Sequence, residues 1–399
     1  MASREKALQD LRVLEIGSLI GGPFCATLMA EFGAEVIKVE DPKVGDPIRH
    51  GGKNVHGTSS EFISMSRNKK CITLNLRVPE GQELFKRLVP LADVVIENFR
   101  PGTLRGWNLD YPELSKINPR LVLAHVSGFG QYGPYRDRLA FDRIALAFAG
   151  QDYITGFPDR PPVKLAGAVA DHITGLFCTI GVMFAIYHRD FHGGKGQEID
   201  LALYEGLFRL MNQVEEYDQF GIIPERLGNT NPKFAPAETF MTKDRQWLVI
   251  NAGTDNTWKR FVRTMDREDL EQDPKFHTIG KRAENEDELH AIIAEWTARH
   301  DLKELTDRLE KEGIPACKIN NIADVFQDPH IAARENIVET LLSSGHKIKT
   351  AGIVPKLSKS PGSIEHIAPA LGAHNEEIYK NLLSLSDAEY DALKKGKII

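Results

Sequence analysis

The sequence predicts an α/β fold with a large domain built on a parallel sheet and a smaller α+β domain. Three observations lead to this fold class. Residues 12–40 read as strand, helix and strand, and the same alternation continues to about residue 203. After residue 236 the pattern changes to charged helices around a short strand. With 399 residues, 42% of them hydrophobic, the chain is long enough for two domains.

The first βαβ unit shows how its elements are predicted. RVLEIG, residues 12–17, is a short apolar run that ends in glycine. A helix is expected over residues 23–33, because Pro23 suits a first turn and Gly33 a stop, and AEVIKVE, residues 34–40, is the second strand. Ligands of such sheets bind beyond the carboxyl ends of the strands. However, the turn GSLIGGP lacks the GxGxxG pattern of a dinucleotide site, and Pro23 removes an N–H donor.

Basic residues flank the next predicted strands. CITLNL, residues 71–76, alternates like a strand and stands between the basic segment 67–70 and Arg77. The apolar strand DVVIENF, residues 93–99, runs directly into RPGTLRG, residues 100–106. A solvated charge cluster is the ordinary interpretation of such segments. The alternative is a site for a phosphate-bearing ligand, because these residues adjoin the ligand edge of a parallel sheet.

The remaining segments complete the expected domain organisation. Strands are predicted within residues 119–133 and 196–203, and the segment 221–236 is rich in Gly, Pro and Asn. The expected divisions are a large domain over 1–220, a linker or flap over 221–236, a small α+β domain over 237–330 and a return to the large domain over 331–399.

One acid stands out in the apolar stretch Leu165–Tyr187, where Asp171 is the only formal charge. Apolar residues follow it at helical spacing, so a buried core helix is expected to begin there, and the stretch is short for a membrane span. The simplest role for Asp171 is therefore an N-cap. The alternative is a functional carboxylate, because a buried acid with no cation beside it is costly unless it is used.

Composition and motifs exclude several classes of function. The net charge of −6 argues against a general nucleic-acid binder. HExxH, GxSxG and Walker A motifs are absent from the sequence, so no metal site is expected, and neither a secretory signal nor a membrane segment is predicted. A cytoplasmic protein with reduced thiols is expected, since the four cysteines form no CxxC pair: Cys25, Cys71, Cys178 and Cys317.

Six segments resemble the class III CoA-transferases, which include formyl-CoA transferase and crotonobetainyl-CoA:carnitine CoA-transferase. In order, the segments are VLEIGSLIGGPFCATLMAEFGAEVIKVE, GDPIR, NKKCITLNL, VIENFRPGTL, HVSGFGQYG and GAVADHITG. The similarity covers nearly the whole chain. It implies a Rossmann-like large domain built from both chain ends, a small domain from the middle, and an obligate homodimer of two interlocked rings with no stable folded monomer.

The resemblance also implies a chemistry and a set of site residues. Asp171 matches the family's nucleophilic aspartate, which attacks an acyl-CoA thioester and forms a mixed anhydride and then an aspartyl-CoA thioester. CoA is a substrate, and the acceptor is a carboxylic acid. Ile20 and Gly21 would lie near the pantetheine end of CoA. The other implied CoA contacts are Leu74, Asn75, Leu76, Arg77, Asn98, Phe99, Arg100, Arg105, Phe141 and Asp142.

The sequence departs from the formyl-CoA transferase pattern, which argues against oxalate or formate as substrate. Ile20 replaces a glutamine, Asp41 replaces an arginine that binds CoA, and Gly106 replaces another arginine, with Arg105 beside it. The tetraglycine flap is missing from the corresponding segment, residues 227–236. Succinyl-CoA is a frequent donor in the family, but no residue indicates which acid accepts CoA.

Two alternative functions stay open on the sequence. The first is an α-methylacyl-CoA racemase, a related isomerase that uses a His immediately before an Asp. Here Phe141 precedes Asp142, and a phenyl ring cannot exchange a proton. The second is a non-catalytic CoA- or nucleotide-binding module in which Asp171 is only a helix cap.

Overall fold

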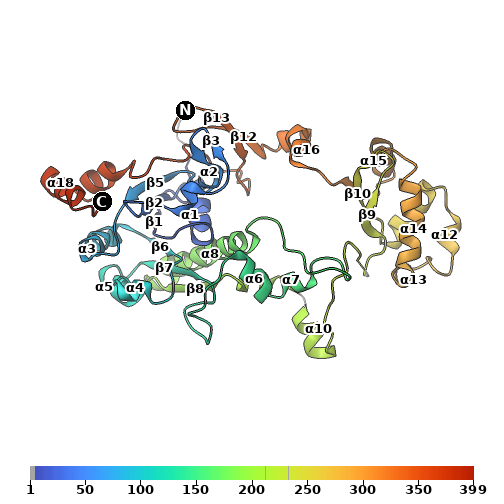
Figure 1. Cartoon of the computed structure of the whole chain (residues 1–399), viewed down its shortest axis with the longest axis horizontal. Helices are drawn as coiled ribbons and strands as arrows, with labels where there is room; N and C mark the ends of the chain where they lie inside the picture. The colour runs from blue at the N-terminus through green and yellow to red at the C-terminus, as the bar shows by residue number, and fades with distance from the viewer. Residues whose placement is uncertain (1–4, 212, 232) are drawn as a thin grey trace. The chain divides into compact units, whose positions relative to one another are not determined.

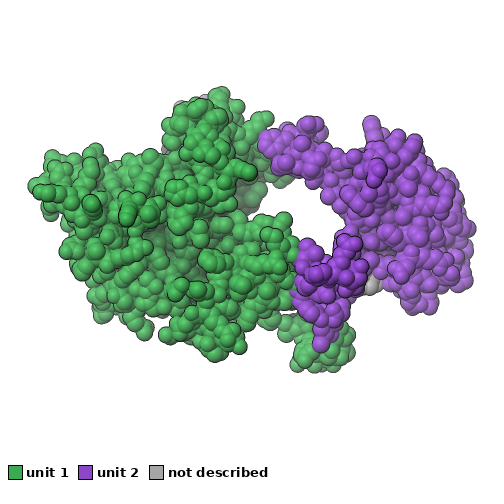
Figure 2. All heavy atoms as spheres, in the orientation of Figure 1, with its two compact units in different colours: residues 1–152, 164–222, 334–399 green, residues 153–163, 223–333 purple. Residues whose placement is uncertain are grey.

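The computed structural model describes residues 5–399 except residues 212 and 232, and the chain divides into two compact units (Figure 2). Unit 1 contains Met1–Asp152, Lys164–Ile222 and Arg334–Ile399. Unit 2 contains Tyr153–Val163 and Ile223–Ala333. Both ends of the chain thus contribute to unit 1. The segment 153–163, which lies within the expected span 1–220 of the large domain, clusters with unit 2.

Unit 1 is organised around a parallel sheet with the strand order β5-β2-β1-β6-β7-β8 (Figure 1). The strands are β1 (Arg12–Glu15), β2 (Glu35–Glu40), β5 (Lys69–Thr73), β6 (Val94–Glu97), β7 (Val122–Ser127) and β8 (Glu198–Ala202). Counted along the chain this is the doubly wound order 3-2-1-4-5-6, which reverses direction between β1 and β6. Ligands of such sheets bind at this switch point. The predicted Rossmann-like α/β fold is confirmed.

Helices cover both faces of the sheet, which explains why its strands are apolar on both sides. Helices α1 (Gly21–Glu31) and α8 (Val169–His188) pack on one face, against residues such as Val94 and Val122. The opposite face is covered by α3 (Pro79–Leu88), α5 (Tyr111–Ile117), the π-helical segment η4 (Glu377–Leu382) and α18 (Asp387–Lys395).

The returning C-terminal segment also protects the edge strand β5 (the red segment beside the blue strands in Figure 1). The N–H of Cys71 donates to His374 Nδ1 at 3.0 Å, and the N–H of Thr73 donates to Asn375 Oδ1 at 2.9 Å. The Tyr379 hydroxyl donates to the carbonyl of Thr73 at 2.7 Å. Side chains therefore satisfy the edge that a further strand would otherwise pair with.

The other elements of unit 1 are short. Its helical segments are η1 (Pro47–His50), α2 (Ser60–Met65), η2 (Val89–Leu91), α4 (Thr103–Gly106), α6 (Asp142–Phe148), α7 (Gln151–Ile154, ending in unit 2), η3 (Arg189–Gly193), α9 (Glu205–Arg209) and α10 (Gln213–Phe220). Two hairpins are formed by β3 (Asn54–Val55) with β4 (Thr58–Ser59) and by β12 (Ile337–Leu341) with β13 (Lys347–Ala351).

Unit 2 is an α+β unit with its own core. Its antiparallel sheet has the order β11-β10-β9, from β9 (Ala237–Met241), β10 (Trp247–Asn251) and β11 (Ala316–Lys318). The helices are α11 (Asp255–Thr264), α12 (Asp269–Gln272), α13 (Ile279–Glu284), α14 (Glu286–Thr297), α15 (Leu302–Lys311), α16 (Ile322–Gln327) and α17 (Pro329–Ala333). The fully buried Arg282 donates to the carbonyls of Ala235, Phe276 and Gly253, which ties three segments around this core.

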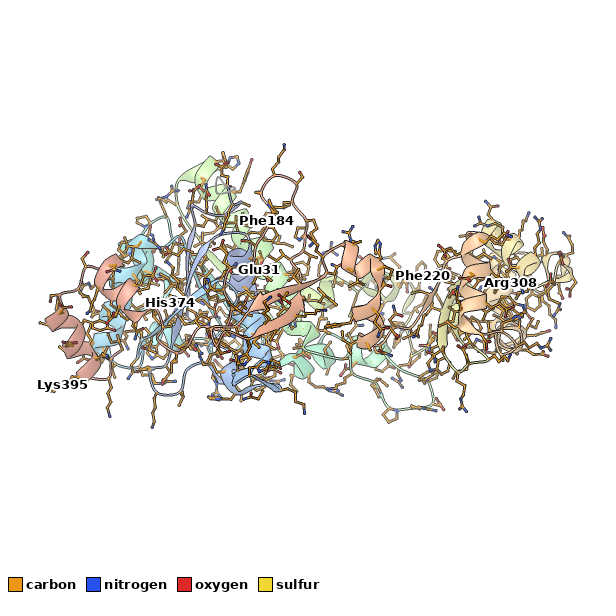
Figure 3. The ribbon with its side chains drawn as sticks, turned by 90° about the horizontal axis from the view of Figure 1, so that it is seen from above. Glu31, Phe184, Phe220, Arg308, His374 and Lys395 are labelled. Atoms are coloured by element: carbon orange, nitrogen blue, oxygen red, sulfur yellow. The ribbon has the colours of Figure 1, made fainter. Side chains whose placement is uncertain are left out.

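Two expectations about elements are wrong. The strand expected over residues 71–76 is Lys69–Thr73, so Leu74–Leu76 form the loop after it. Helix α8, expected to be buried, exposes apolar side chains, including Phe184 at 71% (labelled in Figure 3). The exposed α8 stripe consists of Leu176, Ile180, Phe184 and Tyr187. Among the described residues, Val169–Gly193 is the one helical stretch long and apolar enough to cross a membrane, which by itself is weak evidence for a span.

Candidate active site

Asp171 lies in the first turn of α8, but it is not the helix cap. The helix begins at Val169 with Ala168 in the N-cap position, so the expectation that Asp171 caps the helix is wrong. A second carboxylate, that of Asp142 at the start of α6, takes over this function. Asp142 Oδ1 accepts hydrogen bonds from the N–H of Ala170 at 2.7 Å and of Asp171 at 3.3 Å. The carboxylate of Asp171 is consequently available for another role.

The Asp171 carboxylate faces the first residue of α1, where only glycine fits without crowding. A Cβ on Gly21 would lie 3.3 Å from Asp171 Oδ1. One turn along α8, a Cβ on Gly175 would lie 3.0 Å from the carbonyl oxygen of Gly21 and 2.9 Å from the Phe24 ring. The two glycines thus allow α1 and α8 to pack closely, which brings the start of α1 against Asp171.

The pKa of Asp171 is raised to about 6, mainly because burial disfavours its charged form. The negative charge of Asp142 raises the pKa further, whereas His172 lowers it. At neutral pH the group is still largely ionised, but its charge is poorly stabilised. A carboxylate in this condition is suited to act as a nucleophile.

Asn98 fixes the turn that precedes α1. Its Oδ1 accepts from the N–H of Ser18 at 2.8 Å, and its Nδ2 donates to the carbonyl of Ser18 at 2.7 Å. Ile20, also predicted as a site residue, is half-buried at the N-cap position of α1. The turn that leads from β1 to Gly21 is therefore held by Asn98 and ends at Ile20.

A cavity of about 200 Å³, here called the edge cavity, lies beyond the carboxyl ends of β1, β2, β5 and β6. Four predicted CoA contacts line it, namely Leu74, Leu76, Arg77 and Phe99. Arg77 also forms an ion pair with Asp41 at this cavity. Asn75 lies behind the lining, where its N–H donates to the carbonyl of Ile398 at 2.7 Å.

Arg100 and Arg105 do not line the edge cavity. They line a second cavity of about 250 Å³ beside β6 and β7. There His125 pairs with Glu97 through Nδ1 and with Glu198 through Nε2 at 2.8 Å. The structure thus divides six of the predicted CoA contacts between two cavities. Phe141 precedes Asp142 and is 68% exposed.

The basic segment 67–70 is not an open phosphate site, because Arg67 and Lys69 are buried in ion pairs and Lys70 lies between two carboxylates. Arg67 pairs with Glu31 at 2.9 Å and Lys69 with Glu15 at 2.6 Å. Lys70 pairs with Glu35 at 2.5 Å and with Glu377 at 2.7 Å. These partners are remote in sequence, so the pairs could not be identified from local charge. Among the described residues, no group of three or more His, Cys, Asp or Glu side chains is placed to hold a metal ion.

Sequence reasoning missed Asp46, a buried residue of the loop after β2. Its Oδ1 accepts hydrogen bonds from the N–H of Leu19 at 3.1 Å and of Ile48 at 3.0 Å. The available signal was an acid between Gly45 and Pro47, in GDPIR, one of the six segments that carry the resemblance. Asp46 therefore links the loop after β2 to the turn before α1.

The doubly wound sheet and the carboxylate at its ligand edge define an α/β enzyme of the nucleotide-binding type. Comparison with known proteins makes the class specific. The family model for CoA-transferase family III matches residues 8–375, and the chain belongs to this family of class III CoA-transferases.

Named relatives extend over nearly the full chain. Succinyl-CoA–D-citramalate CoA-transferase of Chloroflexus aurantiacus is 42% identical over 99% of this chain and 98% of its own length. Succinate–glutarate CoA-transferase of Agrobacterium fabrum is 34% identical over 96% and 97%. A crystal structure of a CAIB/BAIF family protein from Brucella suis has a TM-score of 0.85 at 34% identity, covering 95% of this chain and 100% of that one.

Proposed function

We propose that the protein transfers CoA from an acyl-CoA to a carboxylic acid through covalent intermediates on Asp171. The observation that carries this proposal is a half-buried carboxylate with a raised pKa, facing Gly21 at the edge of the sheet. Because Asp142 satisfies the start of α8, the structural role of a cap does not account for Asp171. This argues against a binding module in which Asp171 is only a cap.

The proposed reaction has four steps and no net proton transfer. An oxygen of Asp171 attacks the thioester carbonyl, the C–S bond breaks, and CoA thiolate leaves an acyl-aspartyl anhydride. The thiolate attacks the Asp171 carbonyl carbon, which releases the donor acid and forms aspartyl-CoA. The acceptor carboxylate then attacks the aspartyl thioester carbonyl and displaces the thiolate, which gives a second mixed anhydride. The thiolate attacks the acceptor's acyl carbon in this anhydride, which releases the Asp171 carboxylate and gives the new acyl-CoA. Covalent catalysis divides a difficult exchange into easier steps.

The proposed CoA contacts comprise all the predicted residues, six of which line the two cavities described above. The nucleotide part would occupy the edge cavity, beside Leu76, Arg77 and Phe99. The pantetheine part would pass Ile20 and Gly21 to reach Asp171. Arg100 and Arg105, which line the second cavity, would contact negatively charged groups of CoA there. Because the relatives are named for succinyl-CoA with D-citramalate, L-malate and mesaconate, we propose succinyl-CoA as donor and a small dicarboxylic acid as acceptor.

We also propose that the working form is a cytoplasmic homodimer, with the two chains interlocked. The exposed α8 stripe supports association, because four large apolar side chains on one helix face favour burial against a partner. We further propose the domain organisation expected from the sequence, with boundaries at residues 221, 237 and 331.

The test is the intact mass of the protein after incubation with succinyl-CoA. A covalent adduct is expected with the wild type and is expected to vanish in Asp171→Ala. Asp137→Ala, which removes an exposed carboxylate paired with Arg136, is the matched control and should retain the adduct. Acyl exchange without any adduct would contradict the covalent route. Deuterium uptake at the α-carbon of a 2-methylacyl-CoA would instead support the racemase.

A further inference from the structure

We propose that Asp46 is a positioning residue for the nucleophile: it holds Leu19 in a left-handed backbone conformation and so fixes where Gly21 lies against Asp171. The inference rests on the proposed role of Asp171. It adds a residue outside the predicted set, one that lines the edge cavity beside the proposed CoA nucleotide but does not contact the reacting atoms.

Leu19 adopts a conformation that a leucine avoids. Its φ is 63°, in the left-handed region where the Cβ of an L-residue crowds its own carbonyl. Its side chain is 36% exposed, so burial does not compensate for this backbone geometry. Polar contacts to the main chain must therefore maintain the turn.

Three side chains, two of them buried and that of Asn98 half-buried, hold the turn at three successive residues. Lys38 Nζ donates to the carbonyl of Gly17 at 3.2 Å. Asn98 engages both the N–H and the carbonyl of Ser18. Asp46 accepts from the N–H of Leu19 at 3.1 Å. The contact from Asp46 is thus the one made at the residue with the disfavoured conformation.

Asp46 is itself held rigidly in a buried cluster of charges. Its Oδ2 pairs with Lys38 Nζ at 2.7 Å, and Lys38 also contacts Glu15 at 2.6 Å. Glu15 in turn pairs with Lys69 at 2.6 Å. Burial alone would raise the pKa of Asp46, but the charge of Lys38 and the hydrogen bonds hold that pKa below its usual value. Asp46 is therefore ionised at neutral pH and keeps its acceptor oxygen on Leu19.

The position of the turn matters because α1 starts two residues after Leu19. Gly21 is the first residue of α1, and a Cβ there would lie 3.3 Å from Asp171 Oδ1. A thioester that reaches Asp171 by passing Gly21 would be misplaced if the turn relaxed. Small misplacements of reacting groups cost up to about 100-fold in rate.

The experiment is a double-variant cycle between Asp46 and Leu19, read out as the single-turnover rate of adduct formation with succinyl-CoA. Asp46→Ala is expected to slow this step by about 10- to 100-fold at saturating succinyl-CoA, where weaker binding of CoA in the edge cavity would not account for the loss. Adding Leu19→Gly to Asp46→Ala should restore at least about fivefold, because glycine adopts a positive φ without a Cβ penalty. Leu19→Gly alone completes the cycle.

The control is Glu31→Ala, which breaks another buried ion pair, with Arg67, at the far end of α1 (Glu31 is labelled in Figure 3). It should lower the thermal stability while the adduct rate stays within about twofold. If Asp46→Ala does not fold, Leu19→Val replaces it, since a β-branched residue disfavours the turn and Leu19 is partly exposed. Leu19→Val is then expected to be at least fivefold slower than Leu19→Gly.

Two results would overturn the inference while leaving the proposed function intact: a wild-type rate in Asp46→Ala, or no rescue by Leu19→Gly in a folded double variant. Equal rates for Leu19→Val and Leu19→Gly would also overturn the inference. A wild-type protein that forms no adduct would contradict the proposed function, and the positioning role with it.

Discussion

At the scale of single residues, the raised pKa of Asp171 follows from its partial burial and from the lack of a paired cation. No cation pairs with it among the described residues, and Asp142 adds a second negative charge nearby. The sequence indicated the burial and the missing cation, because a lone acid stood in an apolar stretch. The contact with Asp142, 29 positions earlier, depends on how α6 approaches α8 and could not be predicted from either segment.

The first prediction concerns the pH dependence of adduct formation. With the pKa of Asp171 at about 6, the rate should rise with pH through about 6 and level off above pH 7. Asp142→Asn removes the negative charge but keeps an oxygen that can accept from Ala170. The pKa of Asp171 should fall, so the rising limb should move to lower pH. A limb that stays in place or moves upward would contradict the electrostatic argument.

A second prediction follows from the same pKa shift by thermodynamic linkage. A carboxylate whose pKa is raised on folding stabilises the fold below its unfolded pKa, near 3.8, and loses that contribution as pH rises through about 6. Asp171→Asn removes the poorly stabilised charge, so it should be more stable than wild type by about 1–3 kcal/mol at pH 8. Near pH 4 the difference should disappear. Urea unfolding at the two pH values, at one protein concentration, measures it.

At the scale of elements, close packing of α1 on α8 places Asp171, the proposed nucleophile. Gly175→Ala adds a Cβ 2.9 Å from the Phe24 ring and 3.0 Å from the carbonyl oxygen of Gly21. The expected loss of stability is about 1–3 kcal/mol, accompanied by slower adduct formation. Gly280→Ala, also in a helix but with open space around the added Cβ, should cost nothing measurable. Equal melting temperatures for the two variants would contradict this packing argument.

Strands β6 and β7 carry a second electrostatic device, the buried pair of Glu97 with His125. Burial alone would lower the pKa of His125, but Glu97 and Glu198 raise it above the ordinary histidine value. A raised histidine pKa stabilises the fold below pH 6.5, and this contribution is lost as pH rises through the folded value. Unfolding free energy should therefore decline on the alkaline side, and His125→Gln should flatten that decline. An equal decline in unfolding free energy with rising pH in the wild type and in His125→Gln would contradict this prediction.

The elements themselves were largely predictable. Strands β1, β2, β6, β7 and β8 match short apolar runs, and α3 begins at Pro79, a residue suited to a first helical turn. The capping box of α18, from Ser386 to Glu389, is likewise visible in the sequence. The end of β5 could not be predicted, because Leu74 and Leu76 continue the alternation of apolar residues beyond the strand. They lie in the loop after it, buried beside the edge cavity. A buried loop and a strand leave the same pattern of apolar residues.

At the scale of the whole molecule, the exposed α8 stripe bears on the proposed dimer. Phe184→Glu places a charge in the stripe and should shift the protein toward monomers or unfolded chains, as measured by sedimentation velocity. Ile117→Glu, on α5 at the opposite face of the sheet, is the control and should leave the sedimentation coefficient unchanged. A dimer that survives Phe184→Glu would exclude the stripe from the contact. The sequence showed α8 to be apolar throughout and could not show which face is left uncovered.

The C-terminal segment that completes β5 has a consequence for synthesis of the chain. The amides of Cys71 and Thr73 acquire their partners only when His374 and Asn375 have left the ribosome. Residues 223–333, by contrast, emerge as an uninterrupted stretch with their own core. Residues 223–333 can therefore fold while unit 1, most of which is synthesised earlier, still lacks the segment that covers the edge of β5.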